Sequence, residues 1–184
     1  MIVFKKIKWM NFLSTGNAWT EVDLHRNKST LIVGDNGAGK STVLDALSFV
    51  LYGKPFRKIS KNQLLNSINK KKLCVEVVFQ INTNQYRIIR GIKPNLLEVY
   101  QNGTMLNQDA AVRDYQEALE KQILKLNHKS FCQVVVLGSA TFTPFMQLPA
   151  THRREVIEDL LDIQIFSTMN ALLKERTQTN RDEL

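Results

Sequence analysis

The sequence is poor in cysteine and contains no long apolar run. Its 184 residues include 2 cysteines, Cys74 and Cys132, which stand far apart and match no metal-binding or redox spacing. We therefore expect two buried free thiols in a reducing compartment. No apolar segment approaches the ~20 residues that a membrane-spanning helix needs, and the first residues lack the apolar core of a signal peptide. These absences predict a cytoplasmic protein with no membrane partner.

Acidic residues are nearly absent from one part of the chain. Residues 54–93, the basic window, contain ten Lys and Arg residues and a single acid, Glu76, whereas the whole chain has a net charge of +8. Basic side chains bind nucleic acid by neutralising phosphates and releasing counterions, although most charge runs are only solvated surface. A solvated face and a contact with a partner protein are therefore alternatives. The predicted contacts to double-stranded DNA are Lys54, Arg57, Lys58, Lys61, Lys70, Lys71 and Lys72.

Helix-breaking residues are missing from the C-terminal part, since no glycine follows Gly138 and no proline follows Pro149. From residue 151 onward, apolar residues recur at spacings of three and four, and charged residues occupy many of the positions between them. This pattern predicts an amphipathic helix over 151–184. Its apolar positions are Val156, Leu160, Ile163, Phe166, Met169 and Leu173.

Apolar and alternating patterns predict the remaining elements. Strands are expected at 2–9, 22–24, 29–33, 73–81, 85–89, 96–101, 104–106 and 131–137, with 29–33 and 134–137 as buried strands. Helices are expected at 41–52, 62–67 and 110–124. Together these elements predict an α/β fold with a mixed sheet and β-hairpins around the helix 41–52.

Residues 34–41, Gly-Asp-Asn-Gly-Ala-Gly-Lys-Ser, match the phosphate-binding pattern GxxxxGK(S/T). An apolar run leads into the loop and a helical pattern leaves it, which is the context that the motif requires. Glycines allow the backbone amides to converge on phosphate oxygens at the positive end of a helix. The predicted ATP contacts are Asn36, Gly37, Ala38, Gly39, Lys40, Ser41 and Thr42, with the Ser41 hydroxyl as a ligand of Mg²⁺.

The residues needed for hydrolysis are not recognisable in the sequence. A P-loop ATPase also needs a carboxylate near Mg²⁺ and a group that orients the attacking water, and no apolar run here ends in Asp-Asp or Asp-Glu. Asp45 lies in the predicted helix after the loop, where packing or a surface position is expected. We therefore predict a nucleotide-binding chain with no catalytic residue of its own.

These motifs resemble the ABC-type ATPase heads of the SMC and SbcC-like DNA-repair families. The resemblance rests on the phosphate loop with Leu44-Asp45-Ala46 after it, on the opening 7–14 with its Asn11-Phe12-Leu13-Ser14 turn, and on the strand 86–90. The segments 53–57, 90–95 and 143–146 are most similar to the large subunit of phage recombination exonucleases. The family has an arginine at the turn position of Leu13, so no charged nucleotide contact is expected from that side chain.

The resemblance implies that the chain is the N-terminal half of an ATPase head. Residues 1–150 would form its N-terminal lobe, with a basic hairpin region at 54–106, and 151–184 would begin a coiled coil. The signature motif and the catalytic Glu would lie in a C-terminal half. The family's Q-loop position corresponds to Ser139, a weak candidate for contacting Mg²⁺, with Gln133 and Thr141 as substitutes.

The family's activity implies an ATP-binding subunit of a DNA double-strand-break repair and recombination exonuclease. ATP would drive dimerisation with a second copy of the head, clamp double-stranded DNA and gate a nuclease subunit docked near the coiled-coil root. Two alternatives remain from the sequence. One is the nucleotide-binding domain of an ABC transporter, and the other is a nucleotide-gated DNA clamp that does not hydrolyse ATP.

Overall fold

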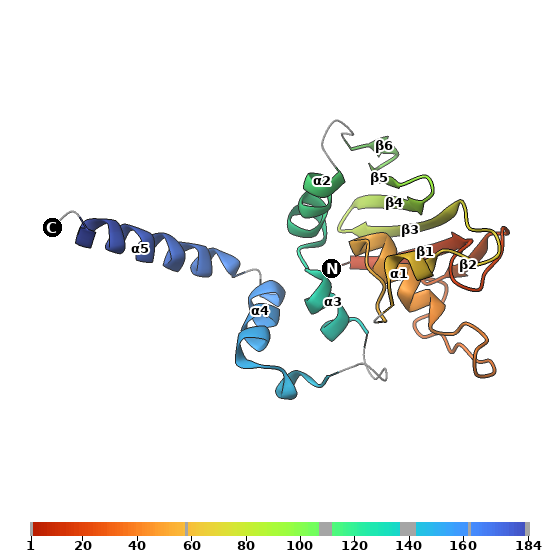
Figure 1. The fold of residues 1–184 in the computed structure, drawn as a ribbon, viewed down its shortest axis with the longest axis horizontal. Coiled ribbons are helices and arrows are strands. Elements are labelled where there is room, and N and C mark those ends of the chain that lie inside the picture. The colour runs from red at the N-terminus through yellow and green to blue at the C-terminus, as the bar shows by residue number, and fades with distance from the viewer. Residues whose placement is uncertain (1, 58, 107–111, 137–142, 162, 183–184) are drawn as a thin grey trace. The chain divides into compact units, whose positions relative to one another are not determined.

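The computed structural model describes residues 2–57, 59–106, 112–136, 143–161 and 163–182. The chain divides into two units, Met1–Ala118 and Leu119–Leu184. The first contains the sheet and the second contains helices (Figure 1). The domain division at residue 150 stays a prediction.

The first unit contains a six-stranded antiparallel sheet in the order β2-β1-β3-β4-β5-β6. Six of the predicted strands are confirmed, with ends that differ by at most three residues. Apolar and polar residues alternate along the central strands, so one face of each is buried. The strands are β1 (Ile2–Met10), β2 (Thr20–Asp23), β3 (Leu73–Ile81), β4 (Asn84–Ile92), β5 (Leu96–Gln101) and β6 (Thr104–Met105).

The predicted helix after the phosphate loop is confirmed as α1 (Thr42–Tyr52), which packs across β1, β3 and β4 (Figure 1). Nine of its eleven residues are buried. Phe49 and Leu51 are fully buried, as are Val75 and Val77 on the sheet. Burial of each such side chain contributes about 1.5–3 kcal/mol, so α1 lies in the core and cannot shift without disturbing the sheet.

The buried guanidinium of Arg90, on β4, holds the C-terminal end of α1. Its Nε donates to the Val50 carbonyl at 2.9 Å, and another of its nitrogens donates to Gln116, whose amide in turn donates to the Leu51 carbonyl at 3.1 Å. The last carbonyls of a helix have no partner within it, and a cation is favourable there. The helix ends at Gly53, whose φ of 70° is left-handed and whose added Cβ would lie 2.9 Å from Arg90.

The strand predicted at 29–33 is wrong. These residues form no strand, and Leu31 and Val33 are 86% and 80% exposed. A strand needs a neighbour to pair its backbone groups, and within the residues that the structure describes no neighbour pairs with this segment. The segment has the apolar composition of a strand, but none of the described residues forms a strand beside it.

The strand predicted at 131–137 is also wrong, because residues 128–134 form a helix, α3 (His128–Val134). The Asn127 side chain accepts a hydrogen bond from the Ser130 amide at 2.9 Å and caps its first turn. A short apolar run does not distinguish a strand from a helix by itself. The Asn127 cap favours the helix here. Val134 and Val135, which were predicted to be buried, are 39% and 44% exposed.

Two other predicted helices differ in form. The segment predicted as a helix at 62–67 contains a 3₁₀ turn, η1 (Lys61–Leu64), after which Leu65 pairs with Phe12 in an isolated bridge. The Ser60 and Gln63 side chains cap this turn reciprocally. The helix predicted at 110–124 is described as α2 (Val112–Ala118) followed by a π-helix, η2 (Leu119–Leu124).

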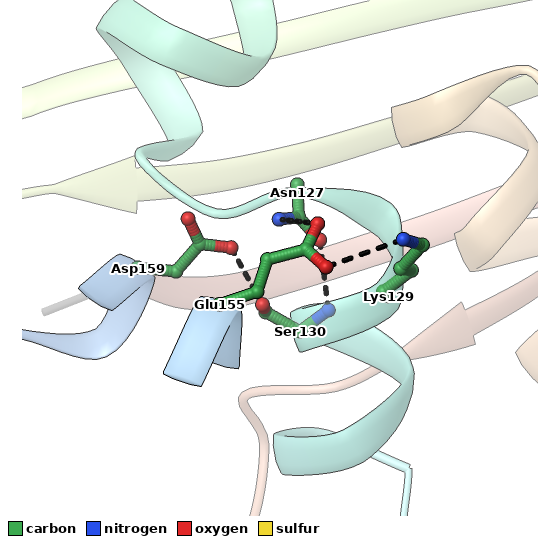
Figure 2. A network of polar contacts seen from close by, with 5 residues as sticks. All are labelled: Asn127, Lys129, Ser130, Glu155 and Asp159. Carbon is green, nitrogen blue, oxygen red and sulfur yellow. Dashed lines mark hydrogen bonds and ion pairs between the residues drawn. The ribbon is translucent and has the colours of Figure 1, made fainter. Parts of the chain in front are cut away.

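In the second unit, polar contacts join α3 to α4 (Ala150–Leu160) (Figure 2). The Ser130 hydroxyl donates to the buried Asp159 carboxylate at 2.5 Å, and Lys129 pairs with Glu155 at 3.2 Å. Asp159 is 5% exposed, so its hydrogen bonds compensate for the loss of water. The contacts hold two short helices together around one buried carboxylate.

The single helix predicted from residue 151 is interrupted. After α4, the Ile163 amide donates to the Glu158 carbonyl, a spacing wider than the α-helical one, and α5 (Gln164–Asp182) then begins. Its apolar residues Phe166, Met169 and Leu173 are 51–65% exposed. A short 3₁₀ turn, η3 (Phe145–Gln147), precedes α4. None of the helices in the described residues has the length and apolarity that crossing a membrane requires.

Both cysteines are free and half-buried. Burial raises the pKa of the Cys132 thiol to about 11 and also raises the pKa of Cys74. A pKa above the usual thiol value keeps both side chains protonated at neutral pH, so neither has the thiolate character of a reactive cysteine.

Replacing Arg90 with Met should lower the free energy of unfolding by about 3 kcal/mol, because buried carbonyls lose a charged donor. Arg87 lies on the same strand but stacks on the Tyr100 ring, with 4.1 Å from its guanidinium carbon to the ring centroid. Arg87→Met is therefore the matched control and should cost less than about 1 kcal/mol. Urea unfolding measures both, and equal losses would contradict the capping role of Arg90.

Candidate functional site

The phosphate loop leads directly into the first turn of α1. Gly37 and Gly39 have φ values of 86° and 92°, in the left-handed region that other residues avoid. The Thr42 amide donates to the Gly39 carbonyl, and Ala38 donates to Asp35, which closes the loop into a compact turn. The amides that follow lie at the N-terminal end of a helix, where an anion is stabilised.

The Lys40 ammonium lies over its own loop. Its Nζ donates to the Gly34 carbonyl at 2.6 Å and to the Asp35 carbonyl at 2.7 Å. Both contacts are exposed, so the ammonium can exchange them for phosphate oxygens at little cost. The predicted phosphate-binding segment 36–42 thus combines the Lys40 ammonium with the backbone amides at the start of α1.

A cavity of about 550 Å³ opens beside the loop. It is formed by three segments that are far apart in the sequence: the phosphate loop, the turn at residues 13–14, and part of the basic window. The sequence predicted ATP contacts in the loop and DNA contacts in the basic window, and the cavity brings residues of both together. The lining residues are Leu13, Ser14, Asn36, Gly37, Gly39, Lys40, Ser41, Thr42, Arg57, Gln63, Leu65 and Ser67.

Arg57 reaches this cavity because a buried carboxylate holds it. The Arg57 Nε donates to Asp45 Oδ2 at 2.6 Å, and the Arg57 amide donates to Asp45 Oδ1 at 3.0 Å. The Asp45 side chain is 0% exposed and the Arg57 side chain is 43% exposed. Planar guanidinium and carboxylate groups pair with fixed geometry, so α1 fixes where the Arg57 cation lies. Of the packing and surface positions that the sequence left open for Asp45, the structure shows the buried one.

The other predicted DNA contacts are surface side chains of the first unit. Lys54, Lys61, Lys70, Lys71 and Lys72 are all exposed. Lys58 lies outside the described residues. Exposed lysines can bind a polyanion such as DNA, and contact with DNA stays a prediction.

The Q-loop candidates fall in the second unit or outside the described residues. Ser139 and Thr141 lie outside them, so their predicted roles remain untested. Gln133 lies on α3, and its Oε1 is a buried oxygen with no hydrogen-bond partner among the described residues.

Several lining residues were not predicted as site residues, namely Ser14, Gln63, Leu65 and Ser67. Ser14 belongs to the turn at 11–14 that carries part of the family resemblance, but no contact was predicted for it, and the other three belong to no recognised motif. They reach the cavity because the Phe12–Leu65 bridge brings the segment after η1 beside the N-terminal turn. Only the pairing of these distant segments could have identified them.

Comparisons with known proteins agree with the motifs. The sequence profile of the AAA domain family matches residues 6–183. Exonuclease subunit 2 of Enterobacteria phage T4 is 44% identical over 169 residues, covering 92% of this chain and 30% of that protein. The same subunit of Escherichia phage RB69 is 41% identical over 173 residues, covering 94% of this chain and 31% of that protein. The chain therefore spans about a third of the length of these curated relatives.

More distant relatives include the DNA double-strand break repair Rad50 ATPase of Sulfolobus acidocaldarius, 28% identical over 169 residues, covering 88% of this chain and 18% of that protein. A solved structure from work on ATP-driven dimerisation and DNA-stimulated activation of SMC ATPases has a TM-score of 0.59 and 24% identity. It covers 86% of this chain and 99% of that chain, which shows a shared fold. The resemblance to SMC-type and phage exonuclease ATPase heads is confirmed, as is the fold class.

Replacing Arg57 with Ala should lower the free energy of unfolding by about 2 kcal/mol, because the buried Asp45 carboxylate loses its cation. The value is at the low end for a buried pair because Arg57 is partly exposed. Lys61→Ala removes a charge from an exposed position nearby and should change stability by less than about 0.5 kcal/mol. Urea denaturation compares the two, and a stable Arg57→Ala variant would mean that the ion pair does not hold the site.

Proposed function

The chain belongs to the AAA domain family, and we propose that it is the ATP-binding N-terminal part of an ATPase head in a DNA-end-processing exonuclease. The observation that carries the proposal is the cavity, where the phosphate loop and Arg57 meet on one side of α1. Relatives of this chain are named as an exonuclease subunit and as a double-strand break repair ATPase, which supports DNA ends as the substrate.

The nucleotide would lie along the N-terminal end of α1. Loop amides and the Lys40 ammonium would hold the phosphates, and the cavity of about 550 Å³ has room for the rest of the nucleotide. Arg57 would add a second cation facing the same space. Both cations lie on one continuous cavity, and this favours a triphosphate over a neutral ligand.

Mg²⁺ would accompany the nucleotide, since the Ser41 hydroxyl lines the cavity directly after Lys40. An oxygen donor beside bound phosphates suits a hard cation that keeps several waters. The Asp45 carboxylate is already paired with Arg57, so it does not supply a second ligand. The bound ion would neutralise phosphate charge, while the chain's own role would be to hold the phosphates in place.

Hydrolysis would require groups from outside this chain segment. In the described residues, no cluster of three His, Cys, Asp or Glu side chains could bind a metal, and the acids nearest the loop in sequence have other contacts or face solvent. The exposed Leu31–Val33 run is most simply explained by pairing strands from the rest of the protein. We propose that this additional part completes the sheet and supplies the catalytic carboxylate.

The partners would be a second copy of the head, a nuclease subunit and double-stranded DNA. The solved structural neighbour comes from work on ATP-driven dimerisation of SMC ATPases, which supports a nucleotide-dependent dimer here. The exposed apolar residues Phe166, Met169 and Leu173 on α5 would meet a second helix of a coiled coil and, near its root, the nuclease subunit.

Lys40→Ala should weaken ATP binding by at least about a hundredfold, because it removes the charge closest to the phosphates. Isothermal titration with a non-hydrolysable ATP analogue and Mg²⁺ measures the affinity. Lys28→Ala, which removes an exposed lysine outside the cavity, is the control and should bind as the parent does. An unchanged affinity for Lys40→Ala would contradict the site.

Replacing Lys70, Lys71 and Lys72 together with Ala should weaken duplex DNA binding and reduce the salt slope of log K by about 2.7, at about 0.9 per lost phosphate contact. Fluorescence anisotropy at several salt concentrations gives this slope. A charge-matched control replaces Lys174, Arg176 and Arg181, which are exposed on α5. If the lysine variant kept the parental slope, these lysines would be a solvated face only.

A further inference from the structure

One short segment touches both proposed sites. Residues 65–72, the lysine loop, line the nucleotide cavity through Leu65 and Ser67 and present Lys70–Lys72 to solvent. Only two residues separate Ser67 from Lys70. A ligand that contacts Ser67 in the cavity therefore acts on the segment that carries the lysines, if hydrogen bonds hold this segment together.

Asn66 makes these hydrogen bonds at the start of the lysine loop. Its side chain is 5% exposed. Its Nδ2 donates to the Leu13 carbonyl at 3.1 Å and to the Thr15 carbonyl at 3.0 Å. Its Oδ1 accepts from the amides of Ile68 at 3.0 Å and Asn69 at 2.9 Å. Both donor positions and both acceptor positions of the amide are filled, so it ties the loop to the turn at residues 11–16.

Asn11 makes the second connection, at the end of the loop. It is 1% exposed. Its Oδ1 accepts from Asn69 Nδ2 at 2.6 Å, and its Nδ2 donates to the Lys72 carbonyl at 3.2 Å. The N-terminal turn, which lines the cavity with Leu13 and Ser14, is thereby bonded to both ends of the lysine loop.

The loop backbone is held in an unusual conformation. Lys70 and Lys72 have φ values of 50° and 52°, in the left-handed region. Non-glycine residues there cost of order 1 kcal/mol and persist where surrounding contacts impose them. The Lys72 amide also donates to the Lys93 carbonyl at 2.9 Å, which places a fourth basic residue beside the three.

The lysines on this loop are available for a ligand. Within the described residues, none of the Lys70, Lys71 and Lys72 side chains takes part in an ion pair or a hydrogen bond. A cluster of adjacent exposed ammonium groups suits the phosphates of a duplex rather than a single anion.

We propose that Asn66 and Asn11 are positioning residues that couple nucleotide binding to duplex DNA binding at Lys70–Lys72 and Lys93. This inference rests on the proposed function, because it needs both ligands to bind. A nucleotide that packs against Leu65 and Ser67 stabilises the hydrogen-bonded form of the lysine loop against local opening, and this is the form that presents the lysines to DNA. By linkage, DNA tightens nucleotide binding by the same factor, which we expect to be about tenfold.

Asn66→Asp tests the coupling in the complete protein. Aspartate keeps the acceptors for Ile68 and Asn69 but loses both donors to the N-terminal turn. Duplex DNA affinity is measured by anisotropy with and without a saturating ATP analogue and Mg²⁺. The parent should bind DNA about tenfold more tightly with nucleotide, and Asn66→Asp should show less than a twofold change. Asn82→Asp makes the same charge change in the exposed β3–β4 turn and should couple as the parent does.

Full coupling in a folded Asn66→Asp variant would overturn the inference, whereas the ATP site would stand as long as the parent binds the analogue. If this variant does not fold, hydrogen exchange on the parent protein decides. Addition of the analogue without DNA should slow exchange of the Ile68 and Asn69 amides by about tenfold, because their hydrogen bonds to Asn66 become harder to open. Unchanged exchange there, with nucleotide bound, would overturn the coupling alone.

Discussion

The buried guanidinium of Arg90 is the interaction on which the geometry of the first unit depends. It lies at the C-terminal end of α1 and bonds the carbonyls of Val50 and Leu51 from a central strand. The phosphate loop lies at the other end of the same helix. With one end held by a strand and both flanks buried, the orientation of the helix is fixed, and so are the amides that face the cavity. A rigid helix end is what an anion site requires, since reorganisation on binding would cost affinity.

Asp45 and Arg57 extend this constraint into the basic window. A buried carboxylate on α1 needs a cation to be stable, and the nearest one comes from the segment that follows the helix. The pairing brings Arg57 to the cavity, and the asparagines at 11 and 66 bring the lysine loop to the same wall. The basic window thus has two surroundings in the structure. Arg57 lines the cavity beside the phosphate loop, while Lys70, Lys71 and Lys72 face solvent.

Two segments of the described residues expose several large apolar side chains. Leu31 and Val33 lead into the phosphate loop yet are 86% and 80% exposed, and α5 exposes an apolar stripe. Contiguous apolar surface of this kind marks places where another chain segment packs. The match to only 30% of the phage T4 exonuclease subunit agrees with a longer functional protein. In the proposed function, the ATPase site is composite, with binding and catalysis carried by different parts of the protein.

The sequence alone determined the phosphate loop, its helix, the positions of six strands and the family, because each depends on short-range spacing that a linear pattern records. It predicted a mixed sheet, whereas the strand pairs of the described sheet are all antiparallel. Residues 36–42 and the alternation in β3 needed no tertiary information. The strands predicted at 29–33 and 131–137 were wrong although both segments are apolar. The first has no partner strand in the described residues, and the second follows a helix cap and forms a helix. Only the tertiary structure decided that Arg57, Leu65 and Ser67 share a cavity with the loop. The physical reason is that buried polar and charged groups such as Asp45, Asn66 and Arg90 need hydrogen-bond partners. The fold brings these partners from distant parts of the chain, and the local sequence does not show which residues they are.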